Sequence, residues 1–289
     1  MIDPAIVWQN SIDINFLVNS GIINFNLQLK LLFLDLNLKM KNYFYLLTLL
    51  TFGFVYAQDN NEPELWITYE YTPKAGMNQK FEAAIAEKTT LFNTAENAAY
   101  TAVLMTGAEA ENGRYERIMP RRTNDWYSKS LSTEESNFWQ KNVVKYIQSG
   151  KGPYVWQRIK SLSINFEEAR PTKYFRSFTR VLKNGNNEDF WRYLKRHSEV
   201  LRKARPDVQE AIFVMSSGGN TNTVRILTAF NDPNEREGQR KEGIVVDMYE
   251  EMYGEGSWED DFQKYNECLV EWTRPTYDFM MLPELSTKL

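Results

Sequence analysis

An internal repeat is the feature that most limits how this chain can fold. The pattern K-x-G-x-N-x-x-F occurs at residues 74–81 and again at residues 183–190. A run of residues typical of a β-strand comes before each copy, and a helical pattern comes after it. The sequence therefore predicts two copies of one structural unit, each about 110 residues long.

The correspondence continues through both halves in the same order. The first half is predicted to contain strands at 65–71, 101–106, 114–119 and 153–156, with helices at 78–92 and 134–147. The second half is predicted to contain strands at 175–182, 211–216, 223–230 and 275–279, with helices at 187–203 and 258–272. A Gly- and Asn-rich connection between the second and third strands of each half indicates a hairpin. The order strand, helix, strand, strand, helix, strand is that of the ferredoxin-like βαββαβ unit.

This order predicts an α+β fold made of two tandem βαββαβ ferredoxin-like repeats. In such a unit both helices cover one face of the antiparallel sheet, and the other face stays apolar and uncovered. Two units can bury these faces by packing sheet to sheet. We predict the first repeat at residues 58–170 and the second at residues 171–289.

The arrangement resembles the dimeric α/β-barrel superfamily, whose members pair two ferredoxin-like sheets between subunits or within one chain. The resemblance covers residues 63–286 and rests on the element order and the self-repeat, because K-x-G-x-N-x-x-F is not diagnostic of one family. It implies an intramolecular barrel-like core. The superfamily includes cofactor-free monooxygenases, haem enzymes resembling chlorite dismutase, and proteins of no known activity, so the fold leaves the function open.

The N-terminal region predicts export. Met40 and Lys41 begin a short positive segment, residues 43–55 are uncharged and mostly apolar, and Ala57 ends a small-residue cleavage site. Residues 40–57 are therefore predicted to be a signal peptide, which leaves Gln58 first and places the mature protein in the periplasm or outside the cell. The apolar run is about 13 residues long, shorter than the ~20 that a helix needs to span a bilayer, so we expect no stable membrane anchor.

Residues 1–39 precede this complete signal and are interpreted as an upstream leader from an over-extended gene start. A long genuine n-region is the alternative to that leader, and an interior hydrophobic helix is the alternative to the signal peptide. We expect the mature protein to be a monomer or a homodimer.

Composition excludes several kinds of site. A net charge of −4 argues against a dedicated nucleic-acid binder. With one histidine and one cysteine, the chain can form neither an internal disulfide framework nor a zinc site built on His and Cys clusters. The sequence has no P-loop, no dinucleotide-binding glycine motif after a strand and no nucleophile elbow. We therefore predict no metal site, and no motif indicates a cofactor or a catalytic residue.

His197 is the first candidate ligand-binding residue. It follows Phe190 and Leu194 on a helical stripe that is predicted to face the sheet. In the haem-binding branch of the superfamily a helix histidine of the C-terminal half ligates the iron, so the resemblance implies haem as an alternative to the absence of a cofactor. We favour a histidine that is hydrogen-bonded in the core or at its rim. Lys88, at the matching position of the first half, supports this interpretation because long polar side chains can reach solvent from such a position.

The first strand of each half supplies the other candidates. Tyr69 and Tyr71 share one strand face because side chains alternate with period two. Ile67 shares this face, and the positions in the second half that match Ile67, Tyr69 and Tyr71 are Arg176, Phe178 and Arg180. Guanidinium groups beside aromatic rings can bind a carboxylate or a phosphate in a pocket. The alternative is that this strand face is solvated.

Basic and aromatic residues also gather in and after the third predicted strand of the first half: Arg114, Arg117, Arg121, Arg122, Trp126 and Tyr127. Such a loop can bind anions or sugars, but charged loops are more often only solvated, and we interpret this one as solvated.

Three classes of function follow from these observations. The class we favour is an exported protein that binds a small organic ligand in a pocket between helices and sheet. The second is a cofactor-free monooxygenase-like or haem-dependent enzyme of the superfamily. The third is a partner-binding protein that uses an exposed sheet edge or helix face. An apolar cavity with convergent polar side chains would favour the first two, and a broad exposed apolar patch would favour the third.

Overall fold

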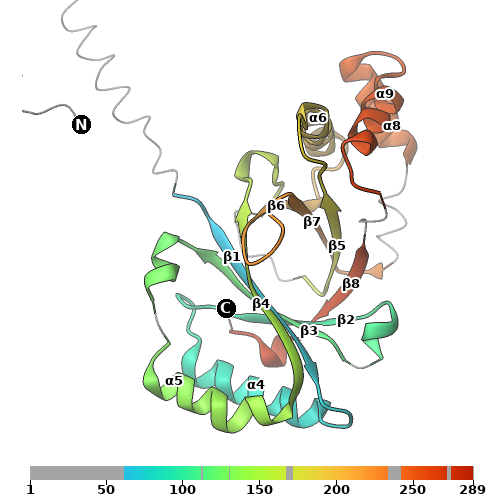
Figure 1. Cartoon of the computed structure of the whole chain (residues 1–289). Helices are drawn as coiled ribbons and strands as arrows, with labels where there is room; N and C mark the ends of the chain where they lie inside the picture. The colour runs from blue at the N-terminus through green and yellow to red at the C-terminus, as the bar shows by residue number, and fades with distance from the viewer. Residues whose placement is uncertain are drawn as a thin grey trace, which may run out of the picture. The chain divides into compact units, whose positions relative to one another are not determined.

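Eight antiparallel strands close into one barrel in the computed structural model of the chain (Figure 1). In chain order they are β1 (Leu65–Pro73), β2 (Tyr100–Leu104), β3 (Tyr115–Arg122), β4 (Ile147–Arg158), β5 (Tyr174–Val181), β6 (Gln209–Ser217), β7 (Thr223–Phe230) and β8 (Thr276–Met281). Around the barrel the order is β1-β3-β2-β8-β5-β7-β6-β4, and adjacent strands are antiparallel. Closure pairs every one of these strands on both sides, so none is left with an open edge.

The structure describes residues 62–111, 113–129, 131–166, 172–233, 242–271 and 275–288. The predicted leader at 1–39 and the predicted signal peptide at 40–57 lie outside these residues, so both stay predictions. Within the described ranges no helix is both long enough and apolar enough to cross a membrane.

The helices lie outside the barrel (Figure 1). Against the strands of the first half lie α4 (Asn78–Phe92) and α5 (Thr133–Phe138), and against those of the second half lie α6 (Glu188–Ala204), α8 (Glu242–Tyr253) and α9 (Ser257–Glu267). Each set covers its sheet with an apolar cluster, which includes Phe81 and Ile85 in the first half and Phe190 and Leu194 in the second. The prediction that Phe190 and Leu194 face the sheet is confirmed, because both are almost fully buried.

Both halves use the same spatial strand order. The first half reads β4-β1-β3-β2 and the second reads β8-β5-β7-β6, which is the order 4-1-3-2 in each. The halves meet where β2 pairs with β8 and where β4 pairs with β6. The prediction of a mixed α+β fold is confirmed, whereas the origin of the two halves by duplication stays a prediction.

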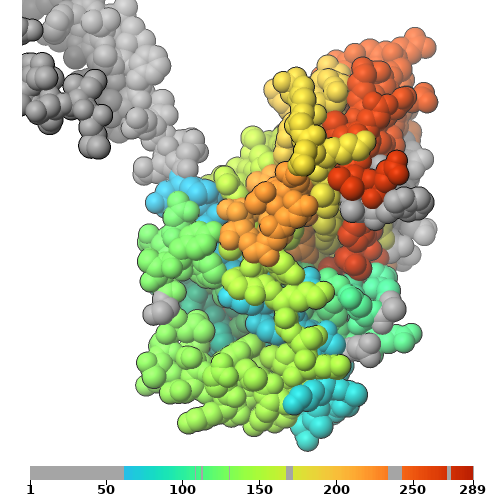
Figure 2. Space-filling model, viewed as in Figure 1, coloured from blue at the N-terminus to red at the C-terminus, as the bar shows by residue number. Residues whose placement is uncertain are grey.

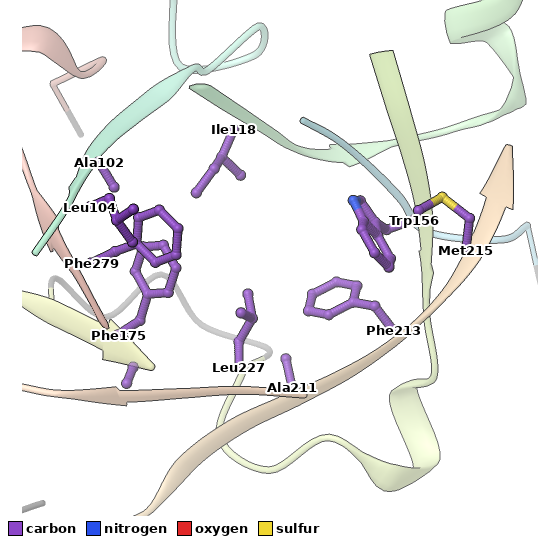
Figure 3. Close-up of a cluster of buried hydrophobic side chains, with 11 residues drawn as sticks. Ala102, Leu104, Ile118, Trp156, Phe175, Ala211, Phe213, Met215, Leu227 and Phe279 are labelled. Carbon is purple, nitrogen blue, oxygen red and sulfur yellow. The ribbon is translucent and has the colours of Figure 1, made fainter. Parts of the chain in front are cut away.

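The barrel interior is filled from all sides by alternate residues of the strands. Figure 3 shows apolar side chains directed into it, among them Ile118, Phe175, Phe213, Leu227 and Phe279. One buried ion pair lies in the same space.

That pair joins Arg225 of β7 to Glu116 of β3, with 2.7 Å between Nη2 and Oε2. Arg225 also donates from Nε to the Ser177 hydroxyl at 2.8 Å. Both charged side chains are less than a tenth exposed, so each compensates the charge of the other where little solvent reaches it.

Several segments differ from the sequence-based prediction; in the second half, the helix predicted at 258–272 ends at Glu267. The α-helix predicted at 134–147 ends at Phe138. A π turn (Trp139–Val143) and a 3-10 turn (Val144–Tyr146) follow it, and β4 begins at Ile147. β4 thus starts six residues before the predicted strand at 153–156, because this Gly-rich segment pairs with the long strand β1. The helix α8 was not predicted, since the first half has no helix at the matching place.

Candidate functional site

A pocket of about 420 Å³ lies between the outer face of the second-half strands and the helices above it. We call it the sheet–helix pocket. Figure 2 shows the side chains of α6 gathered against those of the C-terminal helices α8 and α9, which form its roof. Most of its walls are apolar or aromatic, and they include Tyr193, Leu194, Ile226, Val245, Trp258 and Phe262. Its size and lining are those of a small-molecule site.

His197 of α6 lines this pocket. Its imidazole stacks on the Tyr193 ring, with 5.5 Å between centroids and an interplanar angle of 12°, and lies 5.8 Å from the Trp258 ring. Burial lowers the pKa of His197 to about 4, so the ring is neutral at pH 7. Nδ1 is buried and has no hydrogen-bond partner among the described residues. The prediction of a hydrogen-bonded core histidine is therefore wrong for this nitrogen.

Glu210 of β6 is a second titratable group of the pocket, and it was not predicted from the sequence. It is 8% exposed, and the hydroxyl of Thr228 donates to its Oε2 at 3.1 Å. Burial raises the pKa of Glu210 to about 7. A carboxyl group poised near neutral pH beside a pocket is typical of functional sites. The sequence does contain one indication of this role. Glu210 lies two residues before Ile212, on the strand face that packs against the helices and is otherwise apolar.

Arg176 and Arg180 of β5 enter the pocket on either side of Phe178. Arg176 is neutralised by Asp278, with 2.8 Å between Nε and Oδ1 and 3.1 Å between Nη2 and Oδ2. Arg180 donates only to the main-chain carbonyl of Thr179, at 2.8 Å, and no carboxylate of the described chain pairs with it. Its guanidinium carbon lies 5.4 Å from the centroid of the Phe178 ring. Arg180 is thus the arginine that can accept an anionic ligand.

Tyr69 and Tyr71 do not join this pocket. They lie on the outer face of β1 in the first half, with their rings stacked 6.1 Å apart, and Tyr71 also packs on Phe81 and Trp139. The structure therefore brings together His197 and the two arginines and leaves the two tyrosines outside, because β1 and β5 belong to different halves of the barrel.

The corresponding region of the first half is filled by a polar network. Lys88 forms a buried ion pair with Glu135, with 2.5 Å between Nζ and Oε1. Arg117, which is 4% exposed, donates to Thr89 and to Asn93 at 3.1 and 2.8 Å. These side chains occupy the space that the second half leaves open, so the two halves differ in what they can bind. The expectation that Lys88 reaches solvent is wrong, because this side chain is buried and paired.

Solved structures with the same arrangement match the chain at low sequence identity. A monooxygenase-like protein from Fusobacterium nucleatum matches with a TM-score of 0.51 and 9% identity, over 77% of this chain and 94% of the other. The chain has the dimeric α/β-barrel fold. A monooxygenase-like protein from Lactobacillus acidophilus has a TM-score of 0.49 at 10% identity, covering 78% and 97% of the two chains. A mutant chlorite dismutase from Candidatus Nitrospira defluvii has a TM-score of 0.45 at 11% identity, covering 76% and 92%.

No protein-family model and no curated protein matches the sequence. At these identities the likeness of this dimeric α/β barrel to solved structures shows the fold alone.

His197 is the one histidine of this dimeric α/β barrel that could ligate a haem iron. A metal-ligating histidine normally donates its other ring N–H to a carboxylate, a carbonyl or a water, which fixes the ring. Nδ1 of His197 is buried, and no protein group within the described part of the chain accepts a hydrogen bond from it. The ring is instead oriented by stacking on Tyr193. The described residues likewise contain no group of three or more His, Cys, Asp or Glu that could hold a metal ion.

Proposed function

We propose that this protein binds a small organic anion in the sheet–helix pocket without a bound cofactor. The observation that carries the proposal is the convergence of Arg180, His197 and Glu210 on one largely apolar pocket of about 420 Å³. The apolar walls would bury the body of the ligand. Arg180 would hold its acidic group, because a guanidinium binds a carboxylate through two parallel hydrogen bonds.

The two titratable groups would tune this affinity. His197 is uncharged above its pKa of about 4, and Glu210 is uncharged below its pKa of about 7. Between these values the positive charge of Arg180 acts on the ligand without a competing carboxylate. As the pH rises through about 7, Glu210 ionises and opposes the anion.

We also propose that the protein works after export, with Gln58 as its first residue, and that its halves are duplicated ferredoxin-like repeats. The common strand order 4-1-3-2 supports the duplication. Export is tested by mass spectrometry of protein recovered from the periplasm of an expressing host. A mass that starts at Gln58 supports it, and an unprocessed chain contradicts it.

A second candidate function is a cofactor-free enzyme that moves a proton. Glu210 favours it, because a carboxylate with a pKa of about 7 can remove a proton from a bound substrate at neutral pH.

Pairing with a partner through an open strand edge has no such support, since each described strand is hydrogen-bonded on both sides.

Ligand screening with a matched pair of variants tests the proposal. Native mass spectrometry of the purified protein with a library of small carboxylates and phosphates should identify a ligand that binds one to one. Arg180→Met should lower the affinity for that ligand by about tenfold or more, which corresponds to the loss of a hydrogen bond to a charged group. Lys203→Met removes the same charge from an exposed position of α6 and should leave the affinity unchanged. Equal effects of the two variants, or no binding by any anion, would reject the proposal.

A further inference from the structure

A second and larger pocket, of about 600 Å³, opens at one end of the barrel interior. We call it the barrel-mouth pocket. Its inner wall is apolar and includes Trp66, Ile118, Phe175, Leu227 and Met281. Figure 3 shows Ile118, Phe175 and Leu227 pointing toward one another across the barrel interior. No residue lines both this pocket and the sheet–helix pocket, so a ligand here is independent of the proposed function.

The rim of the barrel-mouth pocket is built by an irregularity in β3. Ile67 of β1 is opposite Met119, but Leu65 is opposite Arg122, so β3 contains one extra residue between these pairs. Arg121, within this bulge, has a φ of 54°, in the left-handed region that a residue with a Cβ atom avoids. A bulge changes the direction in which side chains point.

The bulge brings consecutive side chains to one pocket. In a regular strand, neighbouring residues face opposite sides of the sheet, yet Pro120, Arg121 and Arg122 all line the barrel-mouth pocket. A left-handed residue of this kind costs on the order of 1 kcal/mol or more, and strained residues cluster at functional sites. The strained bulge therefore places positive charge at the edge of an apolar cavity.

The positive charge of Arg122 is held by neutral groups only. Its guanidinium donates to the carbonyl oxygen of Ala98 at 2.7 Å, to Oδ1 of Asn97 at 2.8 Å and to the carbonyl oxygen of Glu96 at 3.4 Å. Within the described ranges no carboxylate forms an ion pair with it. Lys288 is a further exposed cation of the rim. The lining also contains one carboxylate, that of Glu96.

We infer that the barrel-mouth pocket binds a monocarboxylic acid with a large apolar body. The apolar body lies against Ile118, Phe175 and Leu227, and the carboxylate lies at the rim beside Arg122 and Lys288. Burial of the apolar body supplies most of the affinity. The positive charges of Arg122 and Lys288 select an anion over a neutral molecule, although the chain as a whole has a net charge of −4.

Two probe acids distinguish between kinds of apolar body. Isothermal titration calorimetry of the purified full chain is carried out with decanoate, which is flexible, and with 2-naphthoate, which is rigid and aromatic. The neutral amide of each acid serves as its control. We expect at least one acid to bind one to one, and about tenfold or more tightly than its amide, because a charge-assisted hydrogen bond is lost in the amide. Equal affinity of acid and amide, or no binding of either acid, would overturn the inference.

Variants locate the bound acid. Lys288→Glu reverses one rim charge and should weaken binding, whereas Lys80→Glu makes the same change at an exposed position of α4 and should not. Ala229, which is 8% exposed, lies in the pocket wall, so Ala229→Phe should abolish binding by filling the cavity. Arg180→Met, in the sheet–helix pocket, should leave the affinity for the probe acid unchanged. A loss of binding in Arg180→Met with no loss in Lys288→Glu would assign the acid to the sheet–helix pocket and contradict the inference.

Discussion

Replacing Glu210 by glutamine should stabilise the folded protein at about pH 8 and leave it nearly unchanged at about pH 4.5. Burial raises the pKa of Glu210 from its ordinary value of 4.5 to about 7. One pKa unit corresponds to about 1.36 kcal/mol, so ionising this carboxyl costs the folded state about 3 kcal/mol relative to the unfolded chain. Glutamine keeps the shape of the side chain and removes the charge.

The direction of the effect follows from where the proton is bound. Below about pH 4.5 the carboxyl is protonated in both the folded and the unfolded state, so it does not change the free energy of unfolding. Between 4.5 and about 7 the folded state keeps the proton that the unfolded chain has lost, and wild-type stability therefore falls as the pH rises. Above about pH 7 the loss is complete and constant.

Urea unfolding at several pH values measures this difference. The free energy of unfolding of Glu210→Gln minus that of the wild type should rise by about 3 kcal/mol between about pH 4.5 and about pH 8. Glu87→Gln makes the same chemical change at an exposed position of α4, and its difference should stay flat. A flat curve for Glu210→Gln as well would refute the reasoning, because it would mean that Glu210 is not desolvated in the pocket.

Three further predictions concern the barrel, the helix packing and the ligand. Arg225→Met should lower the free energy of unfolding by about 3–5 kcal/mol, because Glu116 is then buried without its partner, and the double variant with Glu116→Leu should recover part of this loss in urea unfolding. Phe190→Ala should cost about 3–5 kcal/mol in the same assay, since this side chain is fully buried between α6 and the sheet. An anion that binds at Arg180 should bind more tightly at about pH 6 than at about pH 8, because Glu210 loses its proton between them, and calorimetry at the two pH values measures the change.

Elements with a complete local pattern could be predicted closely from the sequence. The helix at 78–92 and the strand at 223–230 have the predicted bounds. Each is flanked by Gly or Asn residues that mark a turn beside it. The fold class followed from the order of such elements, because few layer architectures suit an alternation of this kind.

Features set by distant contacts could not be predicted in the same way. The pairings of β2 with β8 and of β4 with β6 close the barrel, and each joins residues far apart in the sequence. The strand β4 begins at Ile147 because β1 offers it a partner, although its own Gly-rich segment has little strand propensity.

The candidate site could also be predicted only in part, because it depends on contacts between distant residues. Side chains alternate along a strand with period two, and this placed Arg176 and Arg180 on one strand face. The helical period of 3.6 residues placed His197 on the sheet-facing side of its helix. The sequence did not indicate that the matching region of the first half is filled by Lys88 and Arg117, so it could not tell which half holds the pocket. Glu210 was missed because its raised pKa depends on burial beneath helices, which no local pattern reports.

The sole histidine of the chain offers the most direct measurement of the sheet–helix pocket. In NMR spectra of tag-free protein, the imidazole signals of His197 arise from one residue and report its charge and its surroundings. We expect them to show no titration between about pH 5 and about pH 8, because the pKa of His197 is about 4. We also expect an anion found by screening to shift them saturably in the wild type and only weakly in Arg180→Met. Signals that titrate near 6.5 and do not respond to the anion would contradict a buried, ligand-binding pocket.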